Sequence, residues 1–315
     1  MDESLYQHCL RPVFTENVIK DLQQQRSLNI YGALGQGRRR LLEDIQKFQW
    51  DSNTKVLMVD MKNHRDSHES FLQALWQQMG MAGKVPKDLS GVLAKFKQAN
   101  SSLNLIFLLH HFDSLLNNAT VHHQFNVKFF DNLNAIRNES NMSLLCVTEK
   151  KHSLSVIFIE EKTHRASWLN LESKRLTGLT FDEIRYEIKQ RLETLSGEEL
   201  REFAHAVYAH IAPYQFLMYC CDNYLNHAND DIKLSQRLKL WKKQYHQDHP
   251  SLTLSNFDYC ANSAVCAYRS LRMGQFLNPL WTGIKVFFVD LPTAVFEWWT
   301  AQKTDEKKPK RTKRK

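Results

Sequence analysis

A glycine-rich stretch followed directly by three arginines is the part of the sequence whose residue types and spacing best suit binding chemistry. Glycine lets the backbone adopt unusual angles, so that its N–H groups can approach phosphate oxygens. An apolar run precedes the glycines and a helical pattern follows them, and the N-terminus of that helix adds partial positive charge. The Gly-x-x-x-x-Gly spacing matches a phosphate-binding loop. The predicted nucleotide or anion site consists of Gly32, Gly35, Gly37, Arg38, Arg39 and Arg40.

The two positions after the last glycine depart from the usual phosphate loop. Lys and then Ser or Thr are expected there, and this chain has Arg38 and Arg39. Arg binds phosphate, even bidentately, but its planar fork does not replace a compact ammonium, and Arg39 has no hydroxyl to hold Mg²⁺. A glycine-rich turn with solvated arginines is the alternative. Three cations at a helix N-terminus oppose the helix dipole by about 0.3–1 kcal/mol each, and a bound polyanion would reverse that sign.

A second motif follows the apolar run at residues 105–109, where an ATPase would place Asp and then Glu. This chain has His110 and His111 there, which leaves Asp113 as the nearest acid. In an ATPase the Asp holds the metal and the Glu polarises the attacking water, whereas imidazole is a poor ligand for a hard ion such as Mg²⁺. The sequence therefore predicts ATP or ADP binding, with Asp113 added to the site, doubtful use of Mg²⁺ and little or no hydrolysis.

The fourteen histidines do not indicate a metal site. His64 and His68 lie four residues apart without partner ligands, and the pairs at 110–111 and 122–123 are adjacent. Neighbouring side chains on a strand point to opposite faces, and no Cys/His spacing matches a zinc module. We therefore expect no metal ligands.

No nucleophile stands in an activating context either, because the Gly-x-Ser-x-Gly elbow of α/β hydrolases does not occur. Cys220 and Cys221 lie in an apolar helical pattern and are predicted to be core residues. No catalytic residue is assigned, and the expected enzyme class is at most a weak P-loop ATPase, with a pseudo-ATPase favoured.

The elements that must position the loop alternate between apolar runs and amphipathic stretches, which is typical of an α/β domain with a parallel sheet covered on both faces. Strands are predicted at 27–31, 55–60, 103–109 and 142–148, with a weaker one at 175–179, and helices at 38–48, 69–79, 88–99 and 129–139.

After residue 179 the pattern becomes helical. Thr180 and Glu183 form a capping box at the start of the first helix. Further helices are predicted at 197–210, 213–227, 231–246 and 254–273.

The order of these motifs resembles the AAA+-related P-loop ATPases of the origin-recognition and STAND kind. Residues 112–116 match the trailing half of that family's second motif, and residues 129–137 with 143–148 resemble its next helix and sensor strand. Residues 176–183 and 212–217 resemble the entry to its helical lid and a recurrent lid helix. The resemblance implies a Rossmann-like P-loop NTPase core with the strand order of that superfamily, an all-helical lid and a short helical C-terminal extension, in a degenerate, non-hydrolysing member.

The expected domains are a P-loop NTPase-like α/β domain at 1–179, a helical lid at 180–249, a helical and aromatic extension at 250–303 and a disordered basic tail at 304–315. Composition fits this plan, because 43% of the 315 residues are hydrophobic and 24% are charged. Those values exclude a disordered chain, a coiled coil and a multi-span membrane protein. The N-terminus has no signal-peptide pattern and no Cys-x-x-Cys pair occurs, so a cytoplasmic protein is expected, with peripheral membrane association left open.

The C-terminal part carries two further signals. Seven of the cations that make the net charge +8 lie in the last nine residues, from Lys307 to Lys315. Residues 275–301 contain three of the seven Trp and four Phe, and they either pack on the body or dock on a membrane surface or a protein.

The function predicted is a nucleotide-binding regulatory or assembly module with degenerate Walker motifs. The alternative is a non-enzymatic scaffold that docks through its C-terminal segment and tail. Expected partners are a protein or a second copy of the chain, and an anionic membrane surface or nucleic acid at the tail. No small-molecule substrate other than nucleotide is expected.

Overall fold

The computed structural model describes residues 8–249 except 118–119, 138, 140, 160–161, 167–168, 211 and 227–231. The chain divides into two compact units, Met1–Leu238 and Lys239–Lys315. The helix predicted at 254–273, the aromatic segment at 275–301 and the basic tail lie outside the described residues. The predicted domain boundaries stay predictions.

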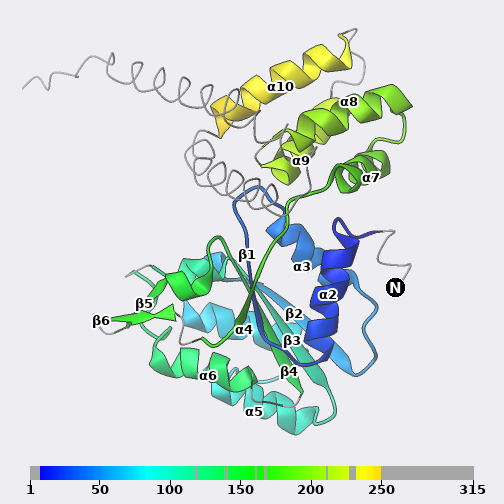
Figure 1. Ribbon diagram of the computed structural model, residues 1–315. Helices are drawn as coiled ribbons and strands as arrows, with labels where there is room; N and C mark the ends of the chain where they lie inside the picture. The colour runs from blue at the N-terminus through cyan, green and yellow to red at the C-terminus, as the bar shows by residue number, and fades with distance from the viewer. Residues whose placement is uncertain are drawn as a thin grey trace, which may run out of the picture. The chain divides into compact units, whose positions relative to one another are not determined.

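The first unit is built on a parallel five-stranded sheet in the order β2-β3-β4-β1-β7 (Figure 1). Its central strands are almost wholly apolar and buried, because helices cover both faces. The Rossmann-like α/β core with a parallel sheet that the sequence predicts is thereby confirmed. In chain order the strands are β1 (Leu28–Tyr31), β2 (Thr54–Asp60), β3 (Asn104–His110), β4 (Met142–Thr148) and β7 (Glu172–Arg175).

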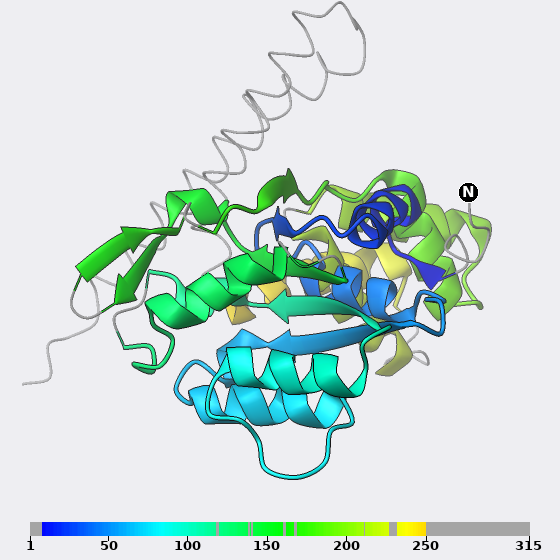
Figure 2. The ribbon, with the colours of Figure 1, turned by 90° about the horizontal axis from the view of Figure 1, so that it is seen from below.

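Helices form a layer on each face of the sheet, as Figures 1 and 2 show. Alternate residues of β3 point to opposite layers. Ile106 and Leu108 pack in the core with α2 (Pro12–Gln23) and α3 (Arg38–Lys47). Leu105, Phe107 and Leu109 pack in the core formed by α4 (His68–Gln78), α5 (Leu89–Ala99) and α6 (Val127–Arg137).

The helices that follow the sheet begin with well-formed caps. The capping box predicted at Thr180 and Glu183 is confirmed, with both of its hydrogen bonds present, and Ser196 and Glu199 form a second. Cys220 and Cys221 are buried, as predicted. The helices are α7 (Phe181–Arg191), α8 (Gly197–Tyr208), α9 (Pro213–Asn226) and α10 (Leu234–Asp248). Among the described residues, no helix has the length and apolar content needed to cross a membrane.

Three elements differ from the sequence prediction. The last strand of the sheet is β7 at Glu172–Arg175 and not residues 175–179, because Leu176 leaves the strand to pack in the core beneath Gly32. The sequence prediction also missed α2 and an antiparallel hairpin of β5 (Val156–Ile159) and β6 (Lys162–Arg165). Short 3-10 turns, η1 (Met61–Asn63), η2 (Phe112–Leu115) and η3 (His152–Leu154), follow the ends of β2, β3 and β4.

Candidate functional site

The glycine-rich loop connects the carboxyl end of β1 to the first turn of α3, as predicted. Gly32 N–H donates to Thr148 O at the end of the neighbouring β4, at 3.1 Å. Gly35 and Gly37 have φ angles of 77° and 80°, values that favour glycine. Helix geometry leaves the N–H groups of the first turn of α3 without intrahelical acceptors. The loop therefore presents a helix N-terminus at the sheet edge where open α/β folds bind ligands.

The lid helix α9 contacts this loop directly. Gly35 O accepts hydrogen bonds from Tyr214 N and Gln215 N, each at 3.1 Å. A Cβ atom on Gly35 would lie 2.3 Å from the Ala212 Cβ, and one on Gly37 would lie 2.9 Å from Tyr214 Cγ. Both glycines therefore serve the close approach of the lid as well as the backbone turn.

Arg38 turns inward from the start of α3. Its residue is only 6% exposed, and its Nη1 is buried with no hydrogen-bond partner among the described residues. Burial lowers the pKa of Arg38, and the nearby carboxylates of Asp113 and Glu149 work against that shift. Arg38 thus places a charged, incompletely paired donor group below the loop.

Arg39 and Arg40 have different surroundings. Arg39 is exposed and pairs with Glu43 one turn along α3, at 2.9 Å. Arg40 is half-buried and donates to Asp44 at 2.7 Å, to Glu187 of α7 at 2.8 Å and to the His8 carbonyl at 2.8 Å. Arg40 therefore joins α3 to the first lid helix.

Arg11, which the sequence prediction missed, holds the loop from the other side. The residue is 1% exposed, and its guanidinium donates to Gln36 O at 2.7 Å and to Thr177 O at 3.0 Å. Burial lowers the pKa of Arg11 to about 10, although nearby acids, Glu183 first, offset part of the shift. One side chain thus ties the loop to the segment that leads into α7. An arginine before Pro12 carries no sequence signal for such a role.

Asp113 is the second residue of η2, the short turn that follows His110 at the end of β3 and His111 after it. Its Oδ1 is buried and has no hydrogen-bond partner among the described residues. Glu149, which follows β4, was also missed, although an acid at the end of a buried strand was a usable signal. Asp113 and Glu149 both act electrostatically on Arg38, so the structure brings Asp113 to the same sheet edge as the loop.

His110 and His111 both face Asp60, which corrects the expectation that adjacent histidines point to opposite faces. His111 has φ 48° and ψ 40°, so the strand ends there and the alternation stops. The two rings lie 3.7 Å apart between centroids. His110 Nδ1 is 3.3 Å from Asp60 Oδ2, and His111 Nδ1 is 2.8 Å from Asp60 Oδ1. Asp60 was missed, but it ends β2 in register with His110, and the ends of parallel strands share one edge.

The charge state of this cluster follows from its burial. Burial, aided by the neighbouring His111, lowers the pKa of His110 to about 4. Burial would raise the pKa of Asp60, but hydrogen bonds from His111 and then His110 lower it overall. Near neutral pH the carboxyl group of Asp60 is therefore ionised and the imidazole of His110 is neutral.

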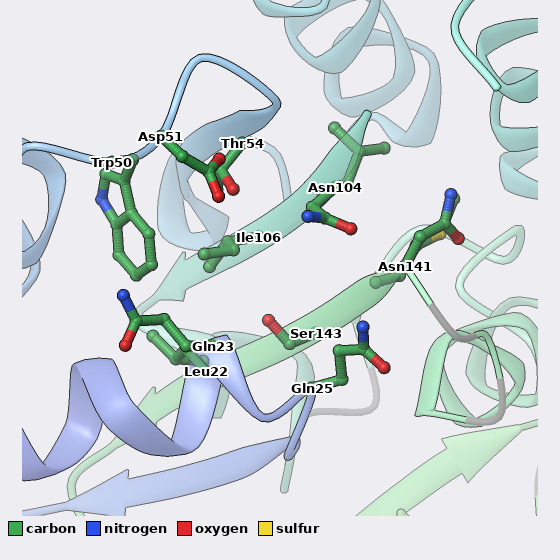
Figure 3. A pocket seen from close by; sticks show the side chains of 12 residues that line it. Leu22, Gln23, Gln25, Trp50, Asp51, Thr54, Asn104, Ile106, Asn141 and Ser143 are labelled. Carbon is green, nitrogen blue, oxygen red and sulfur yellow. The ribbon is translucent and has the colours of Figure 1, made fainter. Parts of the chain in front are cut away.

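A separate hollow of about 200 Å³ opens at the opposite end of the sheet (Figure 3). It is lined mainly by amide, hydroxyl and apolar groups from the start of β2, β3 and β4, with Trp50 and Asp51 at its side. None of the residues predicted to form the nucleotide site lies there.

Comparison with known proteins gives a likeness of fold. No protein family matches the sequence, and no curated protein does. Domain III of the replication initiation protein DnaA from Thermotoga maritima matches with 17% identity and a TM-score of 0.45, over 73% of this chain and 88% of that one. Cdc6p from Pyrobaculum aerophilum matches with 9% identity and a TM-score of 0.49, over 72% and 67%. PCH-2 from C. elegans matches with 12% identity and a TM-score of 0.44, over 74% and 67%.

Proposed function

We propose that the chain is a nucleotide-binding regulatory or assembly module that binds ATP or ADP at the loop of Gly32, Gly35 and Gly37 and hydrolyses it little or not at all. The observation that carries the proposal is Arg38, a nearly buried residue at the N-terminus of α3 whose Nη1 has no hydrogen-bond partner in the part of the chain that the structure describes. A buried, incompletely paired donor is costly unless a ligand satisfies it. A phosphate group at a helix N-terminus supplies the missing acceptor.

The contacts of the residues in the predicted site give each of them a different role. Arg38 and the N–H groups of the first turn of α3 contact phosphate, and the carboxylate of Asp113 acts on Arg38 electrostatically. Arg39 adds an exposed positive charge at the mouth of the site. Arg40, whose nitrogens already meet Asp44, Glu187 and a carbonyl, supports the site by holding the lid.

Binding at this loop would be coupled to the lid. The Gly35 carbonyl is held by two N–H groups of α9, and Arg11 links the loop to the segment before α7. Any shift of the loop on nucleotide binding changes both contacts. The nucleotide biases the lid only to the extent that it binds the two lid positions with different affinity.

The positions that hold Mg²⁺ and polarise water in a P-loop ATPase do not carry suitable residues in this chain. That ion prefers an octahedral shell of oxygen ligands, and the two positions after the apolar strand are His110 and His111. Position 39 is an arginine and not a hydroxyl residue. The donor set therefore supports nucleotide binding without Mg²⁺ dependence and a pseudo-ATPase.

Interaction with partners belongs to the same proposal. The basic tail is suited to polyanions such as nucleic acid or an anionic membrane surface, because its charge is dense and it has no apolar residue to bury. A protein partner or a second copy of the chain would bind with an affinity that depends on the lid position. The scaffold alternative, in which the chain binds partners without nucleotide, predicts that loop variants leave those interactions unchanged.

The proposal is tested by titrating a fluorescent ADP into the full chain and into three variants. Arg38→Ala removes the buried donor. Gly37→Asp adds a carboxylate at the helix N-terminus, and its Cβ would meet Tyr214. Lys47→Ala, at the exposed far end of α3, is the charge-matched control. We expect weaker binding in the first two variants only. Equal affinity in all four proteins would refute the site.

A further inference from the structure

We propose that Asp60, His110 and His111 form a binding site for a divalent transition-metal ion, with Zn²⁺ as the representative ion. The inference stands on these three side chains and does not depend on nucleotide binding. They are the only three metal-ligating side chains in the described part of the chain that cluster closely enough to share an ion, with one ligand atom from each within 4.8 Å of the others.

The backbone fixes this cluster. Asp60 and His110 are the last residues of adjacent parallel strands and are paired in register, so their side chains leave the sheet at the same edge. His111 adopts the left-handed conformation, with φ 48° and ψ 40°. For a residue other than glycine this backbone is uncommon, and here it brings the second imidazole beside the first.

The donor set selects the class of ion. Two imidazole nitrogens and one carboxylate oxygen are ligands that Zn²⁺ and other late first-row ions bind well, whereas Mg²⁺ prefers oxygen alone. The Asp60 carboxylate faces both Nδ1 atoms, at 3.3 Å for His110 and 2.8 Å for His111. An ion that binds these nitrogens takes the place of the proton in each hydrogen bond to Asp60. If the ion instead binds the Nε2 atoms, the Asp60 carboxylate keeps its hydrogen bonds to the Nδ1 atoms and orients the two rings.

The cluster is accessible to a cation from solvent. The side chain of His110 is 5% exposed, whereas those of Asp60 and His111 are 24% and 29% exposed. His110 is therefore held inside the protein, whereas Asp60 and His111 are open to solvent. The site supplies one negative charge, so a divalent ion leaves a net positive charge at the sheet edge that also carries Arg38.

The full chain, stripped with a chelator and free of nucleotide, tests this inference by titration with Zn²⁺, Co²⁺ and Mg²⁺. We expect one tight Zn²⁺ or Co²⁺ per chain, a Co²⁺ absorption spectrum typical of nitrogen and oxygen ligands, and no Mg²⁺ binding. Asp60→Asn and His111→Gln should each weaken Zn²⁺ binding by at least about tenfold. His205→Gln, which removes an exposed histidine on α8, should leave it unchanged.

The chain has fourteen histidines, so Zn²⁺ can also bind elsewhere on it. The variants therefore show whether the bound ion lies at Asp60 and His111. Zn²⁺ affinity in Asp60→Asn and His111→Gln equal to wild type would overturn the proposal, as would a wild-type chain that binds no Zn²⁺ or Co²⁺. If a variant fails to fold by circular dichroism, histidine nitrogen NMR of the wild-type chain replaces it. Zn²⁺ should then shift the ring nitrogens of two histidines, and a shift of none would overturn the site. Loss of nucleotide binding in Arg38→Ala leaves this test untouched, so the two proposals fail separately.

Discussion

Removing the side chain of Arg40 should destabilise the protein strongly, while removing that of its neighbour Arg39 should not. Both arginines lie in the first turn of α3, and both pair with an acid four residues later, Glu43 for Arg39 and Asp44 for Arg40. The difference is burial. The Arg39 side chain is 68% exposed, whereas that of Arg40 is 14% exposed and also reaches Glu187 of α7.

The expected magnitudes follow from what each truncation leaves behind. An exposed ion pair contributes roughly 0.2–1 kcal/mol, which sets the cost of Arg39→Ala. Arg40→Ala leaves two buried carboxylates short of a cation, a change that costs about 3–5 kcal/mol. Asp44 keeps its bond from Leu10 N–H at 3.0 Å, and Glu187 keeps Arg191 at 2.8 Å. We therefore expect the low end, about 3 kcal/mol.

Urea unfolding of Arg39→Ala, Arg40→Ala and wild type, followed by circular dichroism, measures both changes. A double mutant of Arg40→Ala with Glu187→Gln separates the unpaired charge from lost packing, because it removes one of the two carboxylates and should recover part of the loss. Equal destabilisation by the two single mutants would refute the assignment of Arg40 to the joint between α3 and the lid.

Three further predictions concern the loop, a buried histidine and the tail. Gly35→Ala should destabilise the protein by about 1–3 kcal/mol more than Gly83→Ala, because both have positive φ but only the Cβ at position 35 meets a neighbour, Ala212 at 2.3 Å; equal thermal melting points would contradict this. Burial lowers the pKa of His152 below 6.5, so the unfolded chain gains a proton first and stability is lost as pH falls below about 6.5, by up to about 1.4 kcal/mol per pH unit. His152→Gln should flatten that loss in urea unfolding between pH 7 and pH 5, and an unchanged slope would count against a buried neutral imidazole. Truncation after Glu306 should remove salt-sensitive binding to nucleic acid or anionic vesicles, and binding that survives truncation would show that the tail is not the site.

Much of the fold follows from local pattern. Strand β4 lies at the predicted residues 142–148, and the capping box at Thr180 forms as expected, because a continuous apolar run and a cap motif are local signals. Strand β7 was misplaced because it lies at the sheet edge and its residues are polar. The apolar residues that follow it, beginning with Leu176, look like a strand in the sequence, so the prediction placed the strand too far along the chain.

The site was less predictable, because its chemistry depends on burial and on contacts distant in sequence. Nothing in the run from Arg38 to Arg40 tells which arginine turns inward, which meets solvent and which meets α7. The pairing of His110 and His111 on Asp60 needs both the β2–β3 register and one left-handed residue. Alternation along a strand predicted the opposite, since it assumes that the strand continues.

The central claim, a nucleotide site that works without Mg²⁺ and without turnover, is tested most directly by calorimetric titration of ATP into the full chain, once with Mg²⁺ and once with chelator, with released phosphate measured in the same samples. The structure predicts similar affinity in both titrations and little or no phosphate, because His110, His111 and Arg39 stand where an ATPase needs oxygen ligands. Robust Mg²⁺-dependent phosphate release would contradict the account, and so would the absence of any binding heat in both titrations.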